Sequence, residues 1–401
     1  MTVIKDQESI VFRDEKLVTN IPGEILLFDM LFTAKHRDLP AETPLYVDIK
    51  NPNNALSYGQ VKEQALKCAA SFKREFNLQR GDVIAVCSPD NIQCPILFFA
   101  SLVAGCVFSP LRHSSLSSPE EIAYDLDTIR PKLLVLHHTE TKTLTTAKNA
   151  GIPNILVFSP EKESDIPTGI RTLDEALLSS NELAKPYAYT KDEILNTPCC
   201  LYFTSGSTGK RKAVMLSQNV LVSLLLYNTT PLSPSIKHLA PNTFSFVSSL
   251  ITCVIFTVYF GMSVYILDKK QQTLIDICEA VEKYQISLLS MAPYMAYGLV
   301  KEPEVTKKYN LSSVKIVGVG GSSLDKSMAS LIKQNTGLVL INFYGMTECP
   351  GIFENNPDWT LLGSVGRLGS RSSLRIVSAD GKDLPTGQMG ELRVKGPTTT
   401  L

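Results

Sequence analysis

Apolar and polar positions divide the chain into two kinds of stretch, amphipathic segments and short, wholly apolar runs. Residues 58–76 carry apolar side chains at close to helical spacing, which predicts an amphipathic helix. The apolar run at 83–88 is typical of a strand that is buried on both faces of a sheet, and residues 94–105 suit a buried helix. Strands and helices that alternate in this way indicate parallel sheets with right-handed crossovers. The same pattern predicts further strands at 106–111, 132–138, 154–160, 262–267, 286–293, 314–321 and 338–345, and a helix at 273–285.

The longest uncharged segment, residues 246–267, is long enough to span a bilayer. It also contains serines, threonines and a glycine at position 261 that divides it into a helix-like half and a β-rich half. We expect a buried helix followed by a buried strand here rather than a membrane span.

The pattern changes after about residue 361, where short alternating strands are separated by turn signals such as Asp380-Gly381. The expected fold class is therefore α/β, with two packed parallel-type sheets, flanking helices and a small antiparallel, barrel-like β unit near the C-terminus. The expected subdomains are a first α/β unit at 1–190, a second at 191–360 and the small β unit at 361–401.

Composition narrows the class of protein. The 401 residues are 44% hydrophobic and 19% charged, which is normal for a globular protein of more than one packed unit. Lysine plus arginine equals aspartate plus glutamate at 39 each, so no overall field attracts nucleic acid. Nine scattered cysteines without a C-x-x-C pair, and an N-terminus without an apolar signal region, indicate an intracellular protein with reduced thiols.

Residues 204–210 form a polar, glycine-bearing loop between two apolar runs. Backbone N–H groups of consecutive Gly, Ser and Thr can converge on an anion, and a lysine adds charge. The loop is not a Walker P-loop, because only Ser207 and Thr208 separate Gly206 from Gly209. It is open to two interpretations, a phosphate-binding loop and a solvated surface loop.

Two further loops follow predicted strands, where open α/β sheets bind ligands. The first, residues 317–325, is glycine-rich but has Ser323 in place of the third glycine of a dinucleotide fingerprint. The second, residues 342–348, contains Thr347, which could donate to a phosphate, and Glu348, which could hold Mg²⁺. A turn with a packed tyrosine and a solvated glutamate is the alternative for this second loop.

Taken together, these segments resemble the motifs of a known family. The segments TSGSTGKRKAVMLS, VGVGGSSL, FYGMTE, GSVGR and GELRVKGP are similar to those of the adenylate-forming superfamily, which includes acyl-CoA and 4-coumarate–CoA ligases, firefly luciferase and nonribosomal adenylation domains. The resemblance runs from about Leu56 to the C-terminus and implies the large N-terminal domain of that family. It implies activation of an aryl or fatty acid by ATP to an acyl-adenylate, followed by transfer to coenzyme A and release of AMP.

The resemblance also assigns residues by position. Lys212, Thr347 and Glu348 are the implied catalytic residues, with Glu348 as the ligand of Mg²⁺. The implied nucleotide site consists of Thr204, Ser205, Gly206, Ser207, Thr208, Gly209, Lys212, Gly321, Ser322, Ser323, Asn342, Phe343, Tyr344, Gly345, Met346 and Thr347. The implied acyl pocket consists of Phe244, Phe246, Ser249, Val319, Gly320 and Cys349. An apolar lining of this kind favours a hydrophobic or aromatic acid, although the apolar members suit an ordinary core equally well.

The chain departs from the family pattern at several positions. The usual Gly-Leu-Pro-Lys-Gly reads Gly209 to Ala213 with Lys210 and Arg211 in place of Leu-Pro, which leaves these two residues without an implied role. Gln218 replaces a frequent histidine, and Phe244 occupies the position of another near the acyl pocket. The family's small mobile C-terminal domain is absent before Leu401, so we expect a fragment with little thioester-forming activity.

Three functions remain open at this point. The first is an AMP-forming acid–CoA ligase, in the cytoplasm or the peroxisome. The second is an adenylating module that loads the phosphopantetheine of a carrier protein. The absence of an acidic residue from 239–249 disfavours amino acids as its substrates. The third is a non-catalytic nucleotide-binding homologue. Small molecules are the expected partners of the ligase, with no nucleic acid and no transmembrane segment.

Overall fold

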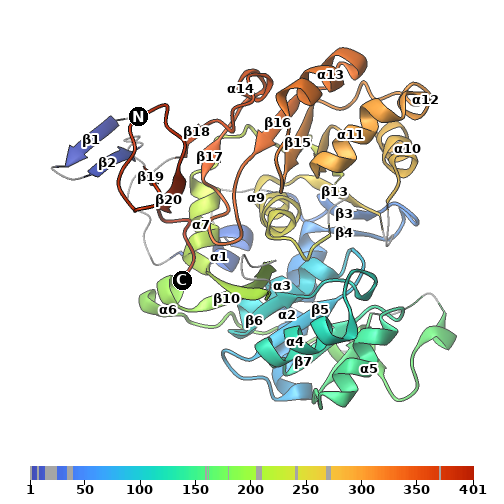
Figure 1. Ribbon diagram of the computed structural model, residues 1–401. Helices are drawn as coiled ribbons and strands as arrows, with labels where there is room; N and C mark the ends of the chain where they lie inside the picture. The colour runs from blue at the N-terminus through green and yellow to red at the C-terminus, as the bar shows by residue number, and fades with distance from the viewer. Residues whose placement is uncertain are drawn as a thin grey trace.

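Two seven-stranded sheets form the body of the protein, in the lower and upper right parts of Figure 1. The computed structural model describes residues 2–6, 9–13, 25–33, 39–158, 160, 162–178, 180–204, 210–239, 243–267, 272–369 and 372–401, of which the first two ranges are considered for their backbone alone. The expected α/β class with two parallel-type sheets is confirmed.

The first sheet is parallel except for its β10–β11 pair, which is antiparallel. Its strands, in spatial order, are β11 (Lys212–Ser217), β10 (Pro198–Thr204), β6 (Val107–Pro110), β5 (Val83–Cys87), β7 (Leu133–Leu136), β8 (Ile155–Val157) and β9 (Arg171–Thr172).

The second sheet is parallel except for its β3–β4 edge. Its strands, in spatial order, are β16 (Leu340–Phe343), β15 (Ile316–Gly320), β14 (Leu288–Met291), β12 (Lys237–Leu239), β13 (Ser263–Ile266), β3 (Pro44–Asp48) and β4 (Ala55–Ser57).

The two sheets are interleaved along the chain, which the expected boundary at residue 190 did not anticipate. Strands β3 and β4 lie before this boundary but pair with the second sheet, whereas β10 and β11 lie after it and pair with the first. The reason is that sheet membership depends on hydrogen-bond pairing between distant segments, which local apolar runs do not specify.

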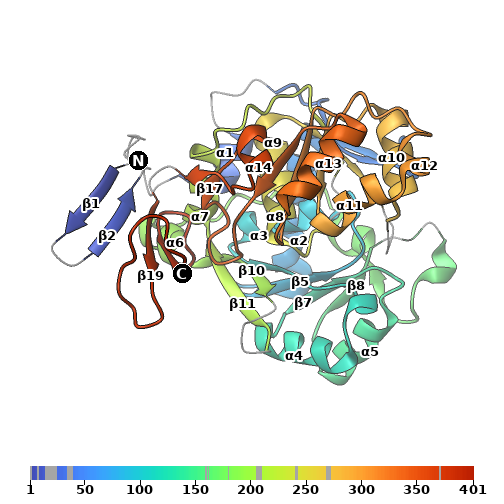
Figure 2. The same cartoon turned by 45° about the horizontal axis from the view of Figure 1, so that its top comes forward.

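Alternating side chains on each strand serve different layers of the fold. On β5, Ile84 and Val86 face a cluster between the two sheets, whereas Ala85 and Cys87 face an outer cluster on the first sheet. The cluster between the sheets also receives Tyr46 of β3 from the second sheet. A layer of helices is therefore sandwiched between the sheets, and further helices cover their outer faces, as the view of Figure 2 shows.

Helix starts follow from local capping. Ser57 accepts from the N–H of Gln60, whose side chain accepts from the N–H of Ser57, and Ser118 and Glu121 repeat this box. The helices are α1 (Leu27–Phe32), α2 (Tyr58–Phe76), α3 (Cys94–Ala104), α4 (Pro119–Ile129), α5 (Thr141–Asn149), α6 (Lys191–Asn196), α7 (Gln218–Leu226), α8 (Val247–Ser249), α9 (Phe256–Phe260), α10 (Leu274–Tyr284), α11 (Pro293–Lys301), α12 (Pro303–Thr306), α13 (Lys326–Thr336) and α14 (Pro357–Leu361), with short 3₁₀ or π turns at η1 (Ser114–Leu116), η2 (Glu163–Asp165), η3 (Asp174–Leu178) and η4 (Leu250–Ile255).

The uncharged segment at 246–267 forms a buried helix and a buried strand, as expected. Helix α8 continues through the π-helical η4 into α9, which ends at Phe260 with Gly261 as its C-cap, and β13 follows. No helix in the described ranges combines the length and the apolar character that are needed to cross a membrane.

A third, four-stranded antiparallel sheet combines both ends of the sequence. Strands β19 (Ser373–Val377) and β20 (Glu391–Lys395) form the expected C-terminal unit, and β2 (Ser9–Arg13) adds to β19, followed by β1 (Thr2–Asp6). The sheet lies at the left of Figure 1. The contribution of the N-terminal strands was not expected. A two-stranded ribbon of β17 (Phe353–Glu354) and β18 (Arg367–Leu368) joins this unit to the body.

The tight path before β18 generates a stability prediction. Gly366 has φ +106°, and a Cβ atom there would lie 1.9 Å from the carbonyl oxygen of Glu354. We expect Gly366→Ala to lower the free energy of unfolding by about 3 kcal/mol, because backbone strain and overlap act together. Gly381, with φ +82° and no atom within 4 Å of such a Cβ, is the matched control. Gly381→Ala should cost only about 1 kcal/mol, the strain alone. Chemical denaturation measures both, and equal losses would contradict the role of the close approach.

Candidate active site

The antiparallel hairpin of β10 and β11 carries the first candidate loop. Its register places Thr204 opposite Lys212, so the predicted phosphate-binding residues lie in the connection between two paired strands. Residues 205–209, which make up most of this loop, lie outside the described residues. The side chains of Thr204 and Lys212 have no hydrogen-bond or ion-pair partner within the described part of the chain, so a ligand can use both.

Arg211, which had no implied role, is buried and makes three contacts. Its guanidinium pairs with the buried carboxylate of Asp125 on α4 and lies 4.8 Å from the centre of the Phe203 ring. Its carbonyl accepts a hydrogen bond of 3.0 Å from the hydroxyl of Tyr124, also on α4. The residue that precedes β11 is therefore anchored to α4 through both its side chain and its backbone.

Burial disfavours both charges of this ion pair. It lowers the pKa of Arg211 and raises the pKa of Asp125 to about 6, against the opposing effect of the Arg211 charge on that carboxyl. Loss of one partner would therefore leave a buried polar group without its compensating charge. The sequence did contain a signal, because Asp125 lies at helical spacing from Ile122 and Ile129 on the buried face of α4.

The strands β15 and β16 bring the second and third candidate loops together. Their parallel register pairs Val319 with Asn342 and Gly320 with Phe343, so both strands end at the same edge of the second sheet. The rings of Phe343 and Tyr344 are each 43% exposed beyond this edge. The ring of Tyr344 packs edge-on against Phe353, with 5.6 Å between ring centres. Nearby Gly321, Ser322 and Ser323 are exposed as well.

Asn342 is held by residues that the sequence did not indicate. Its N–H donates to the hydroxyl of Thr360 at 3.0 Å, and its carbonyl accepts from the amide of Asn355 at 2.6 Å. Asn355 also donates to the carbonyl of Ser364 at 3.1 Å. These bonds hold the end of β16 against α14 and leave the aromatic residues that follow it exposed.

A tight turn presents Thr347 and Glu348. Met346 and Cys349 exchange two backbone hydrogen bonds of 3.2 and 3.0 Å across it. The side chains of Thr347 and Glu348 have no partner among the residues that the structure describes. A solvated glutamate and a carboxylate that is available to a cation both remain compatible with this geometry.

The C-terminal residues connect this turn to the phosphate-loop hairpin. The N–H of Thr400 donates to the carbonyl of Glu348 at 2.9 Å, and the N–H of Leu401 donates to the carbonyl of Met215 on β11 at 3.4 Å. The turn and β11 therefore bind consecutive residues of one segment. This places Glu348 near the strand that begins with Lys212.

The residues of the implied acyl pocket are in different surroundings. Phe246 is 47% exposed, whereas Phe244 belongs to the cluster between the sheets and Val319 to the separate outer core of the second sheet. Ser249 is buried, and the thiol of buried Cys349 lies 3.6 Å from the hydroxyl of Thr398. The structure thus does not bring Phe244 and Val319 into one cluster, and the acyl pocket stays a prediction.

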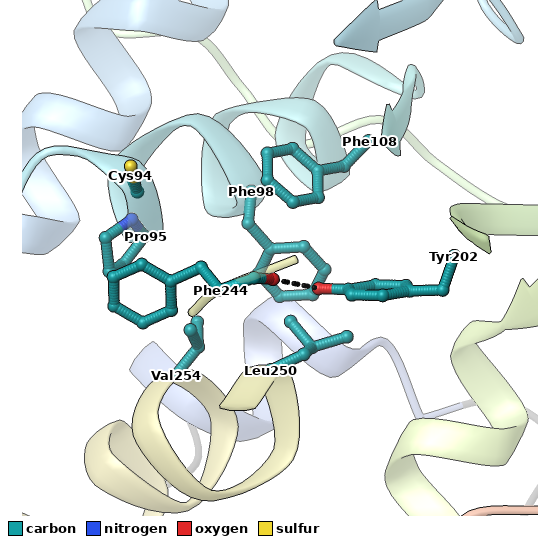
Figure 3. A pocket seen from close by; sticks show the side chains of 8 residues that line it. All are labelled: Cys94, Pro95, Phe98, Phe108, Tyr202, Phe244, Leu250 and Val254. Atoms are coloured by element: carbon teal, nitrogen blue, oxygen red, sulfur yellow. Dashed lines mark hydrogen bonds between the residues drawn. The ribbon is translucent and has the colours of Figure 1, made fainter. Parts of the chain in front are cut away.

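Phe244 is fixed by two polar side chains of the first sheet region. Its N–H donates to the carboxylate of Asp90 at 2.7 Å. Its carbonyl accepts from the hydroxyl of Tyr202 at 3.4 Å, the bond that Figure 3 draws as a dashed line. The ring of Phe244 lines a cavity of about 10 Å³, with Phe98, Leu250 and other apolar residues around it. This volume is close to the smallest that holds one water molecule, so the cavity itself does not accommodate an acid.

Gln218 and His238 are both buried, and each forms a polar contact with another residue of the protein. Gln218, which replaces a frequent histidine of the family, is buried and accepts the N–H of Leu27 at 3.0 Å, at the start of α1. His238 on β12 is fully buried, with its Nε2 atom 2.8 Å from the hydroxyl of Ser290. Burial lowers the pKa of His238 to about 4, so this histidine is neutral at pH 7.

Comparison with known proteins identifies a family for this chain. The family described as AMP-binding enzyme matches residues 33–401. The 4-coumarate–CoA ligase-like 9 protein of Arabidopsis thaliana is 26% identical over 368 residues, which cover 89% of this chain and 62% of that protein. The long-chain-fatty-acid–CoA ligase of Escherichia coli is 25% identical over 392 residues, which cover 90% of this chain and 68% of that protein. The chain thus spans less than two thirds of the plant relative.

Solved structures share the fold. The luciferase-like enzyme of the nonluminescent Zophobas morio mealworm superposes with a TM-score of 0.80 at 22% identity, covering 97% of this chain and 90% of that one. The anthranilate CoA ligase AuaEII, solved in complex with anthranoyl-AMP, gives a TM-score of 0.79 at 20% identity, covering 95% and 70%.

Buried His238 predicts a loss of stability in acid. Its folded pKa of about 4 lies below the ordinary 6.5, so the unfolded chain binds a proton first as the pH falls. The stability that His238 contributes is complete above pH 6.5 and declines toward pH 4, by about 3 kcal/mol in total. Denaturant titrations at several pH values should give a steeper decline for the unchanged protein than for His238→Gln. Parallel curves would contradict the assignment.

Proposed function

Because this chain belongs to the AMP-binding enzyme family, we propose that it activates a carboxylic acid with ATP and transfers the acyl group to coenzyme A, with release of AMP. The family match confirms the resemblance to adenylate-forming enzymes that the motifs carried. Relatives that are named 4-coumarate–CoA ligases and a long-chain-fatty-acid–CoA ligase support an aryl or fatty acid as the substrate. The reaction, its substrates and its partners are proposed from relatives of which this chain spans 62% to 69% of the length.

One observation carries the proposal at the level of the site. Residues 400 and 401 bind the Thr347–Glu348 turn and β11 in succession, so the hairpin with Thr204 and Lys212 lies beside the turn. All four side chains lack partners in the described ranges, and a core or a capping role would have supplied them. Two hydroxyls, an ammonium and a carboxylate are suited to a triphosphate with its cation.

The donor set fits Mg²⁺ with ATP. No cluster of three or more His, Cys, Asp or Glu side chains suitable for a metal occurs among the described residues. Mg²⁺ usually takes only one or two carboxylates and completes its shell with water and substrate phosphates, so Glu348 alone is an adequate protein ligand. When bound, the ion neutralises phosphate charge during attack of the acid on the α-phosphate.

The proposed roles of the protein residues are binding and positioning. Lys212 donates to phosphate oxygens beside Thr204 and the loop at 205–209, and Thr347 donates to the α-phosphate. Tyr344 stacks on the adenine at the edge of β15 and β16, between Gly321–Ser323 and Asn342. An exposed ring at the end of a parallel strand is well placed for this contact, because ligands of open α/β sheets bind at the carboxyl ends of the strands.

The proposal extends to the acceptor thiol and the location. Coenzyme A is the proposed acceptor, and the phosphopantetheine of a carrier protein is the alternative. An intracellular location, cytoplasmic or peroxisomal, is supported by nine cysteines that are all buried and outside any disulfide.

Calorimetry of the 401-residue chain tests the nucleotide site. We expect it to bind Mg²⁺-ATP and a nonhydrolysable acyl-sulfamoyl adenosine but to form little thioester. Glu348→Gln should weaken Mg²⁺-ATP binding about tenfold by removing a charge-assisted contact, with a smaller effect in the absence of Mg²⁺. Glu304→Gln, at an exposed position of α12, is the control.

Two outcomes would count against the proposal. Failure of the unchanged chain to bind either nucleotide would remove the site itself. The second outcome comes from pyrophosphate exchange, measured on the whole protein with a panel of fatty and aryl acids. Absence of exchange with every acid would contradict the proposed reaction.

A further inference from the structure

The start of β11 is the point where the candidate loop rejoins the first sheet. Lys212 is the first residue of β11 and faces Thr204 across the hairpin. Arg211 immediately precedes it, and a peptide bond joins the two residues. Contacts that fix the backbone of Arg211 therefore also limit where the backbone of Lys212 can lie.

Helix α4 and strand β10 hold Arg211 through contacts of three kinds. The hydroxyl of Tyr124 binds its carbonyl at 3.0 Å, the carboxylate of Asp125 pairs with its guanidinium, and the guanidinium lies 4.8 Å from the ring centre of Phe203 on β10. Leu126 of α4 and Phe203 also belong to one hydrophobic cluster. Helix α4, strand β10 and Arg211 at the end of the loop therefore all contact one another.

Lys210 shows that these contacts are not a general feature of the basic residues. It is exposed and has no partner within the described part of the chain. Arg211 is 8% exposed, and the side chain of Asp125 is 4% exposed. Because apolar residues often replace a buried ion pair without loss of stability, stability alone gives little reason for two buried charges here. A planar guanidinium does provide a fixed direction of approach.

We propose that Arg211 and Asp125 are positioning residues of the nucleotide site, whose buried ion pair fixes Lys212 in the orientation that receives the β- and γ-phosphates of ATP. The inference rests on the proposed function, because it assigns a task to the same loop. It assigns a role to a residue that stands where the family motif has a proline.

The test compares the affinities of ATP and AMP, measured by calorimetry with Mg²⁺ on the 401-residue chain. Both nucleotides share the adenosine and the α-phosphate, and ATP alone has the phosphates that Lys212 receives. Arg211→Met and Asp125→Asn should weaken ATP about tenfold and AMP less than twofold, because only the phosphate end of the site is displaced. Arg211→Lys should recover part of the ATP affinity. Lys210→Met is the matched control and should leave both affinities unchanged.

A double variant separates positioning from stability. Arg211→Met with Asp125→Leu removes both charges and should recover the melting temperature that either single variant loses. If the inference holds, the double variant still binds ATP weakly. Recovery of ATP affinity together with stability would overturn it, as would equal losses for ATP and AMP. If the unchanged chain binds neither nucleotide, the proposed function and this inference both fail. If it binds them but the variants give either of these two patterns, only this inference fails.

Discussion

Packing of both large sheets against one layer of helices is the constraint on which the rest of the structure depends. Side chains from β5 and β3, which belong to different sheets, meet in a single hydrophobic cluster. Helix α3 lies within this cluster and is buried on nearly every side, which explains why its sequence is apolar all round. Because interiors are packed as densely as organic crystals, neither sheet can shift without disturbing the other.

A shared interior of this kind fixes the ends of strands relative to one another. The hairpin of β10 and β11 belongs to the first sheet, and the loops after β15 and β16 belong to the second. The helical layer therefore gives their candidate ligand groups a defined spacing, together with the bonds of residues 400 and 401 to the turn and to β11. Precise spacing matters for phosphoryl chemistry, which depends on positioning and charge neutralisation more than on covalent help.

The individual helices and strands could be predicted from the sequence, whereas the pairing of strands within the sheets could not. The helix at 58–76, the buried strands and the division of 246–267 at Gly261 follow from local periodicity and capping, and they occur as expected. The pairing of β3 and β4 with the second sheet, and of β2 with β19, depends on contacts between distant segments. No local pattern of apolar residues carries that information.

The same division holds at the candidate site. The residue types suggested phosphate and cation contacts for Thr347 and Glu348, and the family resemblance assigned Thr204 and Lys212 by their positions in the motif. The roles of Arg211 and of Asp90 could not be read in this way, since each becomes clear only with its partner, Asp125 on α4 or the backbone of Phe244. Arg211 even departs from the family motif, and its function lies in a contact with another element.

The pairing of β2 with β19 has a consequence for synthesis of the protein. Arg13 pairs with Ser373, so every residue between them must leave the ribosome before this part of the small sheet can form. Until then β1 and β2 can pair only with each other, and an isolated two-stranded hairpin is marginally stable in water. Vectorial folding can therefore complete the first large sheet before β19 exists, whereas β1 and β2 must wait for β19 to find their place in the small sheet.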